Sequence, residues 1–141
     1  MPASLCDFLV ILKLSITIVL LGVAVYFDIR KRTIPNILPI LIAVASFIPP
    51  LWPHFDGLVV GLLLFIIAVT TGGIGGGDIK LISAVGLMLG FEVTAVGVTV
   101  GLVFLLLFHV FTTGKLMDDD KAYPLAPFLT AGLIVGYLIY L

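Results

Sequence analysis

Residues 8–36 of the 141-residue chain have the sequence FLVILKLSITIVLLGVAVYFDIRKRTIPN. The first part of this stretch, residues 8–27, is almost entirely apolar, and Asp28 and three basic residues follow it closely. A run of about 20 apolar residues is long enough for an α-helix to cross the hydrocarbon core of a bilayer. This stretch therefore predicts a membrane-spanning helix that ends beside a carboxylate and a cluster of positive charge.

The composition extends this prediction to the whole chain. Hydrophobic residues make up 62% of the sequence and charged residues 11%, and the mean hydropathy is +1.36. A soluble domain of this size could not bury so much apolar surface, so we expect the solvent to be lipid. The few charges form no basic face, which argues against a nucleic-acid partner. The single cysteine, Cys6, excludes an internal disulfide and a multi-cysteine zinc site, and we expect no cofactor or metal.

The apolar runs predict an all-α polytopic membrane bundle with six transmembrane helices in a single domain, residues 1–141. The second and third runs are slightly short and are joined by a proline-rich connection, which predicts a helical hairpin. Residues 81–111 as one straight helix would be about 46 Å long, so we expect the chain to reverse near Gly90–Glu92. The short fourth run then needs local bilayer thinning, cover from protein or a helix start at Asp78. The six runs are residues 8–27, 37–52, 58–71, 81–91, 93–111 and 123–141.

The basic residues predict the orientation of the bundle. With the N-terminus outside, six of the seven Lys and Arg residues fall in connections on one side. Basic connections stay cytoplasmic, so this side is the cytoplasmic face and carries both Asp28 and Asp78. The remaining residue, Lys13, is expected to extend its amine to the outer surface. The first run lacks the basic start and the cleavage site of a signal peptide, and we expect it to remain as an anchor.

Asp28 and Asp78 are candidate catalytic residues because each lies where an apolar run meets a polar or glycine-rich break. Carboxylates at bilayer depth usually face a bundle interior or a water-filled cavity. Two carboxylates held close together share one proton, because both cannot ionise at short range. Such a pair supplies the base and the acid that water attack on an amide requires. Neither residue is assigned one fixed role at this point.

Each feature also has a simpler explanation. Asp28 could pair with one of the basic residues at positions 30–32, and Asp78 could cap the N-terminus of a helix. The glycines before Asp78 either let a substrate strand approach at Gly75, Gly76 and Gly77 or form only a flexible connection. Both acids lie on the same predicted face of a chain with only eight acidic residues, and this joint occurrence favours a site.

The sequence resembles the prepilin peptidase family, the intramembrane aspartic proteases with a Gly-x-Gly-Asp motif. The resemblance implies cleavage of type IV pilin-like precursors with a short basic leader, at the cytoplasmic edge of the inner membrane, with Asp28 and Asp78 as the catalytic pair. The larger bacterial members carry an additional domain with paired cysteines and also methylate the product, whereas this chain resembles the short, peptidase-only form. Three pieces carry the resemblance: Asp28 with Ile34-Pro35-Asn36, Gly75-x-Gly77-Asp78-x-Lys80-Leu81, and Tyr123-Pro124-Leu125-Ala126-Pro127-Phe128.

A third acidic feature is the run of Asp118, Asp119 and Asp120 on the predicted cytoplasmic side. It could attract a basic leader peptide, or it could be a solvated loop partly neutralised by Lys115 and Lys121. His109 has no cysteine or histidine partner at metal-binding spacing and is interpreted as a hydrogen-bonded packing residue. Lys80 is interpreted as a basic anchor at the cytoplasmic edge.

Two other functions fit parts of the pattern. A small proton- or ion-coupled transporter or channel subunit would use the two acids as relay sites. A signal-peptide-peptidase-like protease would use the same acid chemistry, normally in a longer chain with more helices. The sequence does not indicate an oligomeric state.

Overall fold

The computed structural model describes residues 3–48, 52–72, 74–113 and 124–140. Every regular element of these described residues is helical, which confirms the all-α prediction. The elements are α1 (Ala3–Lys31), α2 (Ile37–Ser46), the 3-10 turn η1 (Phe55–Gly57), α3 (Leu58–Thr71), α4 (Gly76–Leu89), α5 (Phe91–Thr113) and α6 (Ala126–Ile139).

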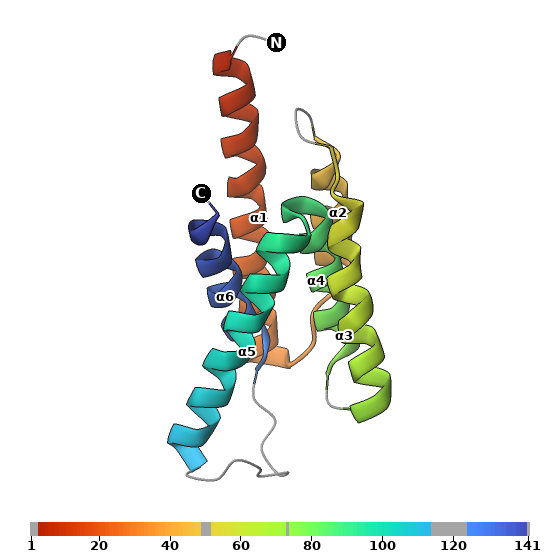
Figure 1. Cartoon of the computed structure of the whole chain (residues 1–141), viewed down its shortest axis with the longest axis vertical. Helices are drawn as coiled ribbons and strands as arrows, with labels where there is room; N and C mark the ends of the chain where they lie inside the picture. Colours follow the sequence, from red (N-terminus) through yellow and green to blue (C-terminus); the bar gives the residue numbers. More distant parts are fainter. Residues whose placement is uncertain (1–2, 49–51, 73, 114–123, 141) are drawn as a thin grey trace.

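Successive helices run in alternating directions (Figure 1). The ends of α1, α3 and α5 and the beginnings of α2, α4 and α6 therefore lie toward the same end of the molecule, the lower end in Figure 1. Asp28 is in the last turn of α1 and Asp78 is in the first turn of α4, so both belong to this end. We call it the carboxylate end.

Two helical segments, Ser4–Lys31 and Phe91–Thr112, are long and apolar enough to cross a membrane. α3 and α6, with 14 residues each, and α2, with 10, are shorter apolar helices. Large apolar side chains cover the outside of the bundle; the exposed fractions are 64% for Val19, 58% for Leu62 and 64% for Leu138. Lipid is the environment in which such a surface is stable.

α4 is the central helix of the bundle. Leu81, Ala84, Val85 and Met88 pack into a core cluster with residues of α1, α2 and α6. Ile82 belongs to a second cluster with residues of α3, α5 and α6. Protein therefore covers α4 on several sides, which accounts for a buried helix of 14 residues where a lipid-exposed span needs about 20.

The chain reverses between α4 and α5, as predicted. Gly90 has φ 87°, a left-handed conformation that glycine adopts without strain, and its amide donates to the Gly86 carbonyl at 2.8 Å. Asp56 of η1 then accepts a hydrogen bond at 3.3 Å from the amide of Phe91, the first residue of α5. The predicted break near Gly90–Glu92 is confirmed.

Lys13 and α2 differ from the predictions. The Lys13 side chain is only 3% exposed, and its amine donates to the Ser46 carbonyl at 2.8 Å, so it does not extend to the outer surface. A helix leaves its last carbonyls without partners and carries partial negative charge there, which a buried amine can satisfy. α2 ends at Ser46, before the apolar run ends at residue 52, because Pro49 and Pro50 cannot continue a hydrogen-bonded helix.

α5 and α6 pack closely together at their glycines. A Cβ at Gly132 would lie 2.6 Å from the Cα of Gly101 and nearer still to the Gly97 carbonyl oxygen and the Gly101 nitrogen. A Cβ at Gly136 would lie 2.8 Å from the Gly97 nitrogen. The backbones touch here, because residues without a side chain allow such a close helix approach.

Candidate functional site

Asp28 is held by the first turn of α6. Its side chain is 7% exposed, and Oδ2 accepts a hydrogen bond at 2.9 Å from the backbone N–H of Ala126. Ala126 is the first residue of α6, and Pro127 follows it, as is common where a helix begins. The contact joins parts of the chain that are 98 residues apart. It fixes the end of α1 to the start of α6.

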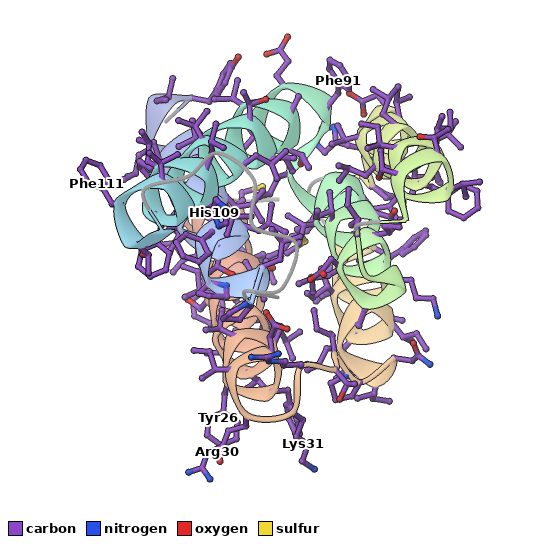
Figure 2. The ribbon with its side chains drawn as sticks, turned by 90° about the horizontal axis from the view of Figure 1, so that it is seen from below. Tyr26, Arg30, Lys31, Phe91, His109 and Phe111 are labelled. Atoms are coloured by element: carbon purple, nitrogen blue, oxygen red, sulfur yellow. The ribbon has the colours of Figure 1, made fainter. Side chains whose placement is uncertain are left out.

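The cations beside Asp28 make other contacts. The Arg30 guanidinium lies 5.6 Å from the centre of the Tyr26 ring, and the Lys31 amine lies 5.6 Å from the centre of the Phe27 ring. Figure 2 shows Tyr26, Arg30 and Lys31 at the edge of the molecule, pointing away from the bundle. The simpler explanation, in which a neighbouring cation pairs with Asp28, is therefore wrong for Arg30 and Lys31.

Asp78 occupies a different environment. It is the third residue of α4, and the helix is preceded by Gly75, an extended residue with φ −68° and ψ 138°. The side chain of Asp78 therefore does not cap the helix, and that simpler explanation is also wrong. Its Oδ1 atom is buried and has no hydrogen-bond partner among the described residues.

The connection between α1 and α2 packs against the first turns of α4. A Cβ at Gly77 would lie 3.2 Å from the Cβ of Ile34, so Gly77 leaves room for this side chain. The Lys80 amine donates to the Asn36 side-chain oxygen at 3.1 Å. The Ile34-Pro35-Asn36 piece thus packs against the Gly75–Leu81 piece. This contact brings the segment that follows Asp28 next to the segment that carries Asp78.

The two carboxyl groups influence each other. Asp78 precedes the apolar run of residues 81–91, and burial, followed by the charge of Asp28, raises the pKa of its carboxyl to about 6. The two groups are therefore close enough for the charge of one to affect the protonation of the other.

The glycine run is partly helical. Gly76 and Gly77 belong to α4, and neither they nor Gly75 has a positive φ, whereas Gly72 has φ 68°. The approach of a substrate strand at Gly75, Gly76 and Gly77 stays a prediction. Gly75 lies beside the carboxylate, because a Cβ there would lie 3.1 Å from Oδ2 of Asp78. The absence of a side chain at this position leaves space beside the carboxylate.

The structure places the other predicted residues as follows. Asp118, Asp119 and Asp120, with Lys115, Lys121 and Tyr123, lie outside the described residues. His109 is a half-buried residue of α5 (Figure 2). Residues 3–48, 52–72, 74–113 and 124–140 contain no cluster of three His, Cys, Asp or Glu residues that could hold a metal.

Sequence reasoning missed the amide of Ala126 as a partner of Asp28. The residues around Ala126 are part of a family motif, but every residue except proline carries a backbone N–H. The residue type therefore does not indicate which N–H donates to Asp28. The available signal was Pro127, which marks the start of a helix whose first amides need partners.

The fold and the site together define a class: a helical membrane protein with one buried and one partly buried carboxyl group at one end of its bundle. Comparison with known proteins agrees. The model of the type IV leader peptidase family matches residues 15–139. The chain belongs to this family.

One curated relative shows how far the similarity extends. Over 131 residues the chain is 36% identical to the prepilin leader peptidase/N-methyltransferase of Bacillus subtilis (strain 168). The match covers 84% of this chain and 52% of that protein, so the chain spans about half the length of the relative. No solved structure matches the chain.

Proposed function

We propose that this chain is an intramembrane aspartic endopeptidase that removes the leader peptide from type IV pilin-like precursors. The family match and the B. subtilis relative support the substrate class. The observation that carries the proposal is that Asp28 and Asp78, 50 positions apart in the sequence, belong to the same end of the bundle, where the charge of Asp28 helps to raise the pKa of Asp78. The N-methyltransferase activity in the name of the relative is not part of the proposal.

The proposed orientation places this chemistry at the cytoplasmic edge of the inner membrane. Arg30, Lys31, Arg32 and Lys80 belong to the carboxylate end, and basic residues favour the cytoplasmic side. We extend this to six transmembrane helices in one domain, with the N-terminus outside. The apolar exterior and the alternating helix directions support this arrangement.

The proposed reaction uses the pair with one proton. The ionised carboxylate removes a proton from water, and the resulting hydroxide adds to the carbonyl carbon of the scissile amide. The protonated partner donates its proton to the carbonyl oxygen. The tetrahedral intermediate then collapses: its C–N bond breaks, the nitrogen takes the proton that came from water, and a hydroxyl proton returns to the second carboxylate. One water is consumed, and the pair regains its original proton.

The transporter alternative finds less support. A relay through the membrane needs ionisable or polar groups along its path. In the central helix, α4, the charged residues are Asp78 and Lys80, both near its start, and the remainder is apolar except for Ser83. This distribution suits a site at one edge of a bundle.

The activity is tested with purified protein in detergent or lipid nanodiscs. A precursor with a short basic leader followed by an apolar segment is added, and the products are weighed by mass spectrometry. We expect two products whose masses sum to that of the precursor plus one water. If a panel of such precursors stays intact while the protein is folded, the proposed function is wrong.

The pH dependence follows from the raised pKa of Asp78. The active pair retains one proton below a pH of about 6 and loses it as the pH rises through this value, so kcat/KM should fall on the alkaline side with a midpoint of about 6. Initial rates from about pH 4 to about pH 9 measure this limb. A kcat/KM that stays constant across this range would show that no such proton is needed.

The acidic run gives a salt-dependent prediction. If Asp118, Asp119 and Asp120 attract the basic leader, replacing all three with Asn should lower kcat/KM roughly three- to tenfold at low salt and much less at high salt, because salt screens exposed charges. Replacing Asp7, which is exposed at the opposite end of α1, with Asn is the matched control. Equal rates for the triple variant and the wild type at both salt concentrations would show that the acidic run does not attract the leader.

A further inference from the structure

The two members of the pair have opposite hydrogen-bond environments. Oδ2 of Asp28 accepts from the Ala126 amide at 2.9 Å, and both residues are buried, with exposures of 7% and 0%. The first amides of a helix have no partner within it and carry partial positive charge. A buried hydrogen bond from such an amide favours the ionised form of a carboxylate.

Asp78 lacks a comparable donor. Its buried Oδ1 receives no hydrogen bond from the described residues. A buried oxygen without a donor disfavours negative charge, and a proton on the group removes that cost. Geometry alone therefore distinguishes the two carboxyl groups, although their residue types are identical.

We propose that the backbone N–H of Ala126 is a positioning group that orients Asp28 as the general base, so that the proton of the pair resides on Asp78. This inference rests on the proposed peptidase function. Asp28 then takes the proton from water, and Asp78 donates its proton to the carbonyl oxygen. On collapse Asp28 passes the water proton to the leaving nitrogen, and Asp78 recovers its proton from the tetrahedral hydroxyl.

Among residues 3–48, 52–72, 74–113 and 124–140, the Ala126 amide is the contact that distinguishes Asp28 from Asp78. α2 and α6, the helices packed against α1, contain no Asp, Glu, Lys, Arg or His within their bounds. α4 contributes Asp78 itself and Lys80, whose amine is bonded to Asn36. On α1, Arg30 and Lys31 lie over aromatic rings and Arg32 is exposed.

The inference assigns a physical role to the third motif piece, which the proposed function left unexplained. Pro124 and Pro127 flank the turn that starts α6 and so determine which amide faces Asp28. The α5–α6 glycine contacts then fix the position of that helix. The start of the last helix thereby becomes part of the catalytic machinery.

A single-atom replacement tests the role of the amide. Cell-free synthesis with a suppressor tRNA carrying lactic acid converts the 125–126 peptide bond to an ester, which replaces the N–H with oxygen and keeps the Ala126 methyl group. On the acid side of the pH profile, kcat/KM falls as the general base takes up a proton, and we call this fall the acid limb. We expect the midpoint of the acid limb to move upward by about one to two pH units, with a smaller change in the midpoint of the fall on the alkaline side. The control places phenyllactic acid at Phe128, in the same first turn of α6, and should leave the acid limb in place.

Three outcomes separate the possibilities. An acid limb that moves in the Ala126 ester and not in the Phe128 ester supports the inference. An unmoved limb overturns it, including the case in which the rate falls equally at every pH, because that pattern indicates a purely structural contact. If folded wild-type protein leaves the precursor intact, the proposed function has failed, and this result is distinct from either of the others.

A second measurement locates the proton without turnover. Infrared spectra of protein labelled with 13C-aspartate, recorded at about pH 5, should show a protonated carboxyl band that disappears in Asp78→Asn and persists in Asp28→Asn. The opposite pattern would place the proton on Asp28 and overturn the inference.

Discussion

Asp28→Asn and Asp78→Asn should each lower the rate of precursor cleavage by about 10⁴-fold or more. An amide has nearly the shape of a carboxylate, so each variant should keep its fold, but it cannot accept or deliver the proton of the pair. Because the two groups act as a unit, the double variant should be little worse than either single variant. Timed mass spectrometry of the cleavage products measures these rates.

Asp7→Asn is the matched control for these variants, because Asp7 is an exposed carboxylate of α1 at the opposite end of that helix. It should cleave at the wild-type rate. Each variant must also show the wild-type helix content and thermal unfolding midpoint. Substantial cleavage by folded Asp28→Asn or Asp78→Asn protein would show that Asp28 and Asp78 are not the catalytic pair.

Gly132→Ala should destabilise the bundle by about 1–3 kcal/mol and reduce cleavage at the same time. The new Cβ would collide with backbone atoms of Gly97 and Gly101, which cannot rotate away as a side chain can. α6 must then move, and its first residue, Ala126, moves away from Asp28. Denaturant titration in mixed micelles measures the free energy of unfolding, and the product assay measures the rate.

Gly22→Ala is the control for this substitution. A Cβ at Gly22 would have no atom within 4 Å outside its own helix backbone and its chain neighbours, so the change should be neutral or stabilise α1 by up to about 1 kcal/mol. Equal stability and equal cleavage for Gly132→Ala and Gly22→Ala would contradict the close α5–α6 contact.

Helix positions could be predicted where bilayer thickness and local chemistry agree. The third apolar run, residues 58–71, coincides with α3, and the reversal at Gly90 followed from the excess length of residues 81–111. The end of α2 was placed too late, because hydropathy continues past Ser46 while the hydrogen bonding does not. The burial of Lys13 was missed because its partner is a backbone carbonyl.

The sequence allowed the acidic side chains of the candidate site to be predicted. It did not allow the backbone contacts of the site to be predicted. Asp28 and Asp78 stand out because acids are rare in this chain and both occur at the ends of apolar runs. The roles of the glycines required coordinates: Gly77 accommodates Ile34, and Gly75 leaves space beside Asp78. Such roles depend on packing between distant segments, which the spacing within one segment does not reveal.

The most direct test of the central claim is whether positions 28 and 78 meet in the membrane. Asp28→Cys and Asp78→Cys are combined in a Cys6→Ser background, and a short bifunctional thiol reagent is added to membranes before proteolysis and mass spectrometry. The account predicts linked peptides that contain positions 28 and 78, and none for the control pair Asp28→Cys with Asp56→Cys, because Asp56 lies in η1 near the opposite end. Thiols at 28 and 78 that both react singly with the reagent and never become linked would contradict it.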